Sequence, residues 1–233
     1  MHHNPGRVEA LKSTLQRVSQ VATVLEPSGI SIRFLNHQHD ENGDFDNLDD
    51  VNLIMTKVNI VYRSEGGATR LGTVLNRKIV LPMIINKLQQ RSLEKPLIVL
   101  IITDGEVCHV TPISTNPFVN TYPNQPTKEP KSELASTISK CKRVMEKQNI
   151  GDASAVFIIS QVGNAPDATD FLRSIQDDEE TGSMVHCSMD KLDQIMAQFQ
   201  RANSNSGYSD SGYTAWVSQF QNQRTTNIYR GLR

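Results

Sequence analysis

The chain has 233 residues, 24 of them basic and 25 acidic, so its formal net charge is −1 at pH 7. This balance gives no attraction toward nucleic acid or an anionic membrane, and no apolar run approaches the roughly 20 residues of a membrane-spanning helix. The three cysteines, Cys108, Cys141 and Cys187, are far apart and odd in number, which favours reduced thiols and a cytoplasmic protein over a disulfide framework.

The N-terminal part of the chain alternates between helical and extended patterns. Apolar residues recur every three or four positions over residues 8–25, which predicts a helix that ends before Pro27. Alternation over residues 30–35 predicts a strand. The acidic residues 40–50 predict a solvated loop that caps a helix over residues 51–58, followed by a brief strand over 59–62. Asp40, Asn42 and Asp44 resemble the start of an EF-hand loop, which here lacks its central glycine and closing glutamate.

Residues 66–73, GGATRLGT, form the first stretch that indicates a binding site. The two leading glycines allow close backbone approach, and the apolar spacing predicts a helix over residues 71–79. We therefore expect Thr69 at a loop-to-helix junction, with its hydroxyl free to bind. Pro82 is expected to kink or end that helix.

Residues 97–102 are the most continuous aliphatic run of the chain, and Thr103, Asp104 and Gly105 close it. The run is too unbroken for a half-solvated strand and too short for a buried helix, so it predicts a buried parallel strand. Ligands bind at the carboxyl ends of such strands, which makes Asp104 a candidate site residue. The connection over residues 109–131 holds five of the ten prolines and is expected to lie over the same rim.

The remaining elements continue the alternation. Helices are predicted over residues 134–145, 168–175 and 192–199, and strands over 155–159 and 184–187. This order predicts an α/β fold with a doubly wound, mostly parallel sheet, helices on both faces and right-handed crossovers. Residues 201–233 are rich in Ser, Asn, Gln and Gly, which predicts a flexible polar C-terminal tail after one domain.

Two stretches in this order, GGATRLGT and LIVLIITDGE, resemble the von Willebrand factor A (vWA) domain, a Rossmann-like fold. The string SAVFIISQVG followed by APDATDFLRSI is similar to the penultimate strand and helix of its intracellular eukaryotic members. The resemblance covers residues 7–200 and implies a non-enzymatic module that binds a protein partner. The family's metal-ion-dependent adhesion site uses a D-x-S-x-S run, a threonine and an aspartate. By motif position, Thr69 and Asp104 would be the last two and would hold Mg²⁺, which prefers oxygen ligands.

The chain departs from the family at its start, because no D-x-S-x-S run precedes Thr69. The resemblance therefore implies an incomplete metal site and a missing first strand, the central one of the family, beside the strand that ends at Asp104. We expect that Met1 does not begin a complete domain. We also expect weak stability, or completion of the sheet by another chain, because each unpaired buried backbone group costs about 1 to 3 kcal/mol.

Other interpretations of Asp104 stay open. An Asp followed by Gly also simply ends a strand in a turn. A metal-dependent hydrolase or phosphotransferase on a doubly wound sheet would use Asp104 as nucleophile or metal ligand. Such an enzyme needs a base at a neighbouring strand end, where Ser160, Gln161 and His186 are weak candidates. A nucleotide-binding P-loop is excluded, because the glycine spacing is not followed by the phosphate-binding lysine.

Overall fold

The computed structural model describes residues 5–37, 40, 42–62, 70–103, 129–130, 132–162 and 166–188. Within them the chain forms an α/β fold with a three-stranded parallel sheet. The strands β1 (Leu97–Thr103), β2 (Ala155–Gln161) and β3 (Val185–Ser188) lie side by side in that order. The register pairs Leu97 with Ala155 and Phe157 with Val185. The predicted α/β class and parallel strands are therefore confirmed.

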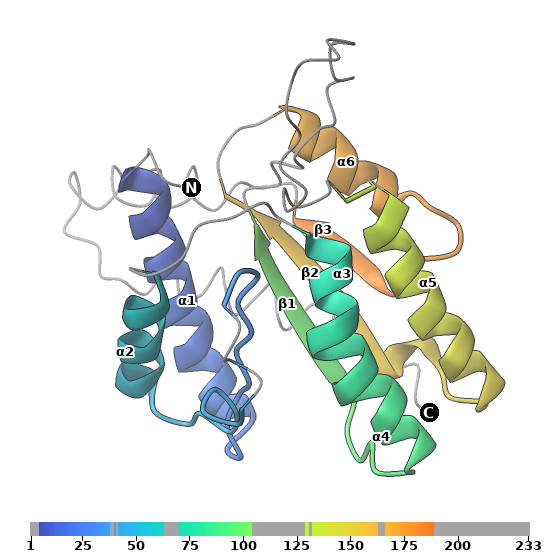
Figure 1. The fold of residues 1–233 in the computed structure, drawn as a ribbon, viewed down its shortest axis with the longest axis horizontal. Helices are drawn as coiled ribbons and strands as arrows, with labels where there is room; N and C mark the ends of the chain where they lie inside the picture. The colour runs from blue at the N-terminus through green and yellow to red at the C-terminus, as the bar shows by residue number, and fades with distance from the viewer. Residues whose placement is uncertain are drawn as a thin grey trace, which may run out of the picture.

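The helices follow the predicted order. Before β1, α3 (Leu71–Leu75), the π-helix η1 (Asn76–Ile85) and α4 (Asn86–Gln89) continue into one another. After β1, α5 (Ser132–Lys147) leads through the 3-10 turn η2 (Asp152–Ser154) to β2, and α6 (Pro166–Gln176) leads to β3. Near the N-terminus, α1 (Pro5–Leu25) and α2 (Val51–Tyr62) pack against each other, to the left of β1 in Figure 1.

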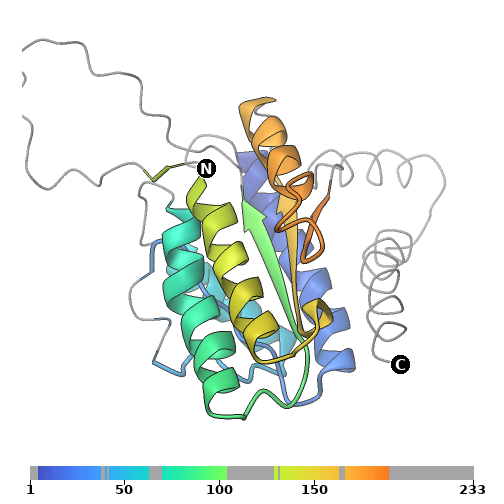
Figure 2. The same ribbon diagram turned by 90° about the vertical axis from the view of Figure 1, so that its right-hand side faces the viewer.

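The main hydrophobic core lies on one face of the sheet. Val99 and Ile101 of β1 are buried there beside Phe157 and Ile159 of β2, because every second residue of a strand points to the same face. In Figure 2, α3 and α5 cover one side of the strands. The helices fill this core with Leu71, Leu75, Val80, Ile84, Ile85, Leu88, Leu134, Ile138, Cys141, Met145, Phe171, Leu172 and Ile175.

A second, smaller cluster lies in the N-terminal part of the chain. Leu48, Ile54 and Val58 are buried in it, and the partly buried Leu15, Ile30, Ile32 and Phe34 pack against them. This cluster joins α1 and α2 to the segment between them. The helices α1 and α2 thus have a core of their own beside the sheet.

Neither predicted N-terminal strand is present, so these two predictions are wrong. Ile30 forms only an isolated antiparallel bridge with Leu48, because the facing segment turns at Gly43 and Asn47, which have positive φ. Residues 59–62 belong to α2, which runs on to Tyr62 because Ile54, Val58 and Val61 maintain the helical apolar spacing.

The acidic segment is only partly as predicted. The Asp50 carboxylate accepts a hydrogen bond from the Leu53 amide at 2.9 Å, which confirms the predicted cap of α2. The prediction that the whole segment is a solvated loop is wrong, because Asp40 is completely buried. Asp40 also faces a lysine inside the protein while Asp44 is exposed, so the two carboxylates do not share an EF-hand arrangement.

Of the two outcomes predicted for Pro82, a kink or an end of its helix, the end is wrong. The helical path runs from Leu71 to Gln89, and Pro82 lies inside the π-helical part. A π segment loosens the local hydrogen-bond pattern around a residue that has no N–H to donate, so the helix continues. The predicted helix over residues 192–199, the tail over 201–233 and most of the proline-rich connection lie outside the described residues.

Candidate functional site

Polar side chains mark the carboxyl end of the sheet. Thr103 ends β1, Gln161 ends β2 and Ser188 ends β3, and all three are buried. The first turn of α3 lies at the same end of the molecule in both views (Figures 1 and 2). In open parallel sheets this end is where ligands bind, because the chain leaves the strands there through loops. It is therefore the candidate functional site.

The two predicted metal ligands, Thr69 and Asp104, fall outside the described residues. The residues next to them are described: Arg70 comes directly before α3, and Thr103 is the last residue of β1. The start of α3 and the end of β1 lie at the same end of the sheet. The flanks of both predicted ligands therefore meet at one rim, while the positions of the ligands themselves stay a prediction.

A carboxylate that the sequence did not reveal lies at this rim. Glu129 accepts hydrogen bonds from the backbone amides of Gly72, at 2.9 Å, and Thr73, at 2.6 Å. These amides belong to the first turn of α3, whose N–H groups have no partner within the helix and attract negative charge. Glu129, near the end of the proline-rich segment 109–131, thus holds the start of α3 in place. Gly72 lies 57 positions and Thr73 56 positions before it in the sequence.

The start of α3 also packs closely against the start of α5. A Cβ atom added at Gly72 would lie 2.6 Å from backbone atoms of Glu133 and Leu134, so only glycine fits there. The Thr137 hydroxyl donates to the Gly72 carbonyl at 3.2 Å. The third glycine of the GGATRLG stretch, Gly72, therefore serves helix packing, a role that its loop-like context in the sequence did not indicate.

The polar groups at the other strand ends are engaged in the protein. Thr169 of α6 donates its hydroxyl proton to the Gln161 side-chain carbonyl at 3.0 Å, which fixes the amide at the end of β2. Ser160 is buried beside it. Neither an amide nor a buried hydroxyl is a general base, so β2 supplies no proton acceptor at this rim.

Metal-binding groups are sparse in the described part of the chain. No cluster of three or more His, Cys, Asp or Glu side chains occurs among the described residues. Cys141 and Cys187 are free thiols, as predicted, and burial raises the pKa of Cys141 to about 12 and that of Cys187 to about 11. Such thiols stay protonated at neutral pH and are poor metal ligands or nucleophiles.

The most unusual charged group of the described structure is Lys78, in η1. Its side chain is entirely buried, and its ammonium Nζ lies 2.7 Å from Oδ1 of Asp40, which is also fully buried. Nζ further donates to the carbonyl oxygens of Phe34, at 2.6 Å, and His37, at 2.5 Å. An ammonium has three protons, so each one has an acceptor.

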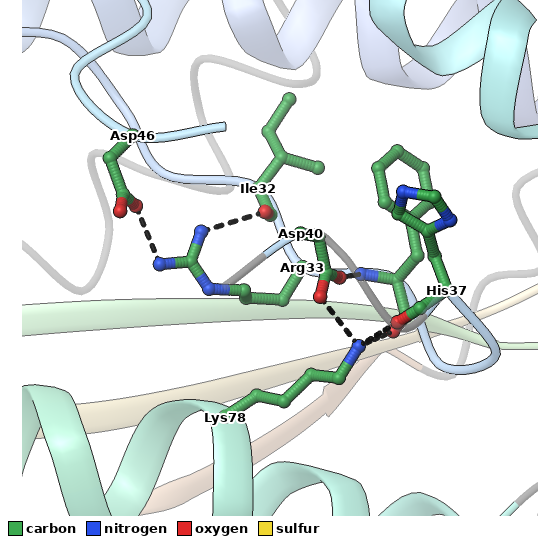
Figure 3. Close-up of polar contacts among 7 residues, drawn as sticks. Ile32, Arg33, His37, Asp40, Asp46 and Lys78 are labelled. Carbon is green, nitrogen blue, oxygen red and sulfur yellow. Dashed lines mark hydrogen bonds and ion pairs between the residues drawn. The ribbon is translucent and has the colours of Figure 1, made fainter. Parts of the chain in front are cut away.

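The Asp40 carboxylate is held on its other side as well. Its Oδ2 accepts the amide proton of Phe34 at 2.5 Å. Figure 3 shows Lys78 reaching from its helix to the loop that carries Asp40 and His37. Leu35 of this loop packs against the main core, whereas Phe34 packs against the N-terminal cluster. The buried pair therefore fastens the two cores of the molecule to each other.

Comparison with protein-family models, with curated proteins and with solved structures found no match. The vWA resemblance thus depends on the motifs alone. Among the described helices, none combines the length and the apolar character that crossing a membrane demands.

Proposed function

We propose that this chain is a cytoplasmic, vWA-type protein interaction module with a doubly wound, mostly parallel sheet and an incomplete metal-ion-dependent site. One observation carries the proposal: the start of α3 and the end of β1, which flank Thr69 and Asp104, lie at the same polar rim of the sheet. A partner protein would bind at this rim. The module extends over residues 7–200, and the polar tail follows it.

Magnesium is the metal that suits this rim. The Thr69 hydroxyl and the Asp104 carboxylate would hold it, since Mg²⁺ takes oxygen ligands and keeps several waters when few protein ligands are present. The described strand ends carry hydroxyl and amide oxygens, at Thr103, Gln161 and Ser188, and none carries sulfur or imidazole. These oxygen atoms fit a hard cation. The Glu129 carboxylate at this rim is already bound to the amides of Gly72 and Thr73, so we expect the cation to be held weakly. A carboxylate of the partner would complete the coordination.

The described strand ends favour binding over catalysis. A hydrolase or phosphotransferase that used Asp104 would need a general base or a second carboxylate at a neighbouring strand end. Gln161 and Ser188 occupy the ends of β2 and β3, and neither titrates near neutral pH. We therefore propose a module without catalytic residues.

A magnesium titration monitored by thermal unfolding tests the proposal. We expect a small rise of the melting temperature with millimolar Mg²⁺, and its loss in Thr69→Ala and in Asp104→Ala. Asp44→Ala removes an exposed carboxylate that belongs to neither motif and should keep the rise. An equal rise in all variants would exclude this metal site. Hydrolysis of a phosphoester by the wild-type chain, abolished by Asp104→Ala, would favour the enzyme instead.

A further inference from the structure

The helix α2 has apolar side chains on two faces, and only one of these faces is buried. Ile54 and Val58 lie in the N-terminal cluster. On another face, Leu53 is 44% exposed and Ile60 is 65% exposed, and Thr56 between them is exposed as well. These three positions are spaced by three and four residues, so they lie on one face of the helix, which we call the outer face of α2. A helix that is apolar on both faces is typical of a helix that is covered on both.

The outer face of α2 is acidic at its start. Asp49 is exposed and comes four positions before Leu53. Asp50, also exposed, caps the helix through the Leu53 amide. The one basic residue of α2, Lys57, is turned toward the Phe45 ring, with its Nζ 5.0 Å from the ring centroid. The outer face therefore suits a helix with an apolar side and a basic end.

The C-terminal segment of the same chain has this complementary pattern. Residues 213–233, which lie outside the described residues, contain three arginines and no acidic residue. Tyr213, Trp216, Val217 and Phe220 follow the i, i+3, i+4, i+7 spacing, which predicts an amphipathic helix. Arg224 comes four positions after Phe220, so a basic residue follows the apolar stripe by one helical turn.

The two patterns match when the helices run antiparallel. On each helix two apolar residues are seven positions apart, and a charged residue stands four positions beyond one end of that pair. The charge precedes the pair on α2 and follows it in the C-terminal segment, so an antiparallel arrangement brings the opposite charges together. This register sets three pairs of residues against each other: Leu53 and Phe220, Ile60 and Tyr213, Asp49 and Arg224.

We propose that residues 213–224 bind the outer face of α2 of the same chain as an antiparallel amphipathic helix. Figure 1 shows α2 at the outer border of the described elements, beside α1. Residues 200–212, which follow the predicted helix 192–199, can span up to roughly 40 Å when extended, more than the roughly 30 Å diameter of a small domain. The covalent connection gives the segment an effective concentration of about 1 mM, so contacts of a few apolar residues suffice. The inference does not depend on the metal site.

Trp216 is the only tryptophan of the chain, so its fluorescence reports on this contact in the full-length protein. We expect emission at a shorter wavelength and weaker quenching by acrylamide than in the urea-unfolded chain, because the bound indole leaves water. Emission and quenching equal to those of the unfolded chain would overturn the proposal. A blue shift that disappears on dilution would overturn it as well, since a second copy would then be the occupant.

Substitutions on α2 test the location of the contact. Leu53→Gln and Ile60→Gln should each shift the emission of Trp216 toward that of the unfolded chain. Both residues are exposed, so the fold should persist, which circular dichroism verifies. Leu81→Gln is the matched control, because Leu81 on η1 is 42% exposed, against 44% for Leu53. An unchanged emission in both α2 variants, or an equal shift in Leu81→Gln, would overturn the proposal.

Charge reversal tests the antiparallel register. Asp49→Lys and Arg224→Glu should each shift the emission of Trp216 partway toward that of the unfolded chain. The double variant Asp49→Lys/Arg224→Glu should restore most of the native emission, because opposite charges face each other again. Glu94→Lys, at an exposed position outside α2, should change nothing. A double variant with no recovery over the single variants would overturn the proposal.

A change in the C-terminal segment keeps the test decisive if the α2 variants do not fold. Phe220→Ser leaves every described residue as it is, and it should shift the emission of Trp216 as far as Leu53→Gln does. Tyr229→Ser lies beyond residues 213–224 and should leave the emission unchanged. Native emission in Phe220→Ser would overturn the proposal.

Discussion

The ammonium of Lys78 lies 2.7 Å from the carboxylate of Asp40, and neither side chain has any contact with solvent. Removing two charges from water is expensive, so such a pair persists only where further hydrogen bonds satisfy both groups. Here the Phe34 backbone supplies an acceptor for Lys78 and a donor for Asp40. The pair therefore determines where Phe34, His37 and Asp40 lie against η1.

Removing one partner of this pair should be strongly destabilising. Lys78→Met keeps the aliphatic stem and leaves the Asp40 charge buried alone, for which we expect a loss of about 3 to 5 kcal/mol in the free energy of unfolding. Urea denaturation monitored by circular dichroism measures this value. The double variant Lys78→Met/Asp40→Leu should recover a large part of it, because no buried charge is left.

The exposed pair of Lys95 and Glu26, 3.1 Å apart, provides the matched control. Lys95→Met should change stability by less than about 1 kcal/mol, since exposed pairs are screened by water and salt. If Lys78→Met proved as mild as Lys95→Met, the buried pair would not hold Phe34 and Asp40 against η1 in solution.

Gly72→Ala should destabilise the contact between α3 and α5. Alanine is favoured over glycine inside a helix by about 1 kcal/mol, yet the added Cβ would lie 2.6 Å from the backbone of Glu133 and Leu134. Overpacking of this kind, which pushes α5 away from α3, costs about 1 to 3 kcal/mol. The clash at Gly72 is at the upper end of this range, because it involves backbone atoms of α5 that cannot rotate aside. We expect a net loss of about 2 kcal/mol in thermal or urea unfolding.

Gly151→Ala is the companion change, because nothing lies within 4 Å of a Cβ at that position and its φ is −67°. It should be neutral or slightly stabilising. Similar losses for the two variants would show that the helix contact at Gly72 is not tight.

Glu129→Ala should weaken the start of α3. The change removes two hydrogen bonds from the amides of Gly72 and Thr73, and with them a negative charge at a helix N-terminus. We expect a loss of about 1 to 2 kcal/mol, measured by urea unfolding. Glu129→Gln should lose less, because one oxygen still accepts. Glu94→Gln, at an exposed position, should have no measurable effect, and an equal loss there would contradict the capping role.

Local patterns predicted β1, α5 and α6 because their apolar residues follow the strand or helix period over the whole element. They could not predict Lys78 with Asp40, or Glu129 with Gly72. Each contact joins residues 38 or 57 positions apart, and each residue alone is typical of a solvated surface. Such contacts arise from tertiary packing, and the spacing of apolar residues within one element carries no information about them.

Pro82 shows tertiary packing overriding a local preference. A proline inside a helix costs about 3 kcal/mol, which is why the sequence predicts a kink or an end of the helix there. Val80, Ile84 and Ile85 on either side of it are buried in the main core. Each contributes about 1.5 to 3 kcal/mol by burial, so together they exceed the cost of the proline. The helix therefore continues, in a π-helical form.

Stability should fall at acid pH partly because of one turn before β3. Hydrogen bonds from the Thr181 amide and hydroxyl hold the pKa of Asp178 below its ordinary value, and the Arg143 guanidinium does the same for the pKa of Glu180. A carboxyl whose pKa is lower in the folded state stabilises the protein above its unfolded pKa, and this contribution disappears as pH falls through the folded pKa. The melting temperature should thus be level from pH 7 to about 5 and fall below about pH 4.

Asp178→Asn should lower the melting temperature at pH 7 and reduce its fall at acid pH, because asparagine cannot be protonated there. Glu179→Gln, an exposed neighbour, should leave the acid profile unchanged; the same profile in wild type and Asp178→Asn would show that this turn does not contribute.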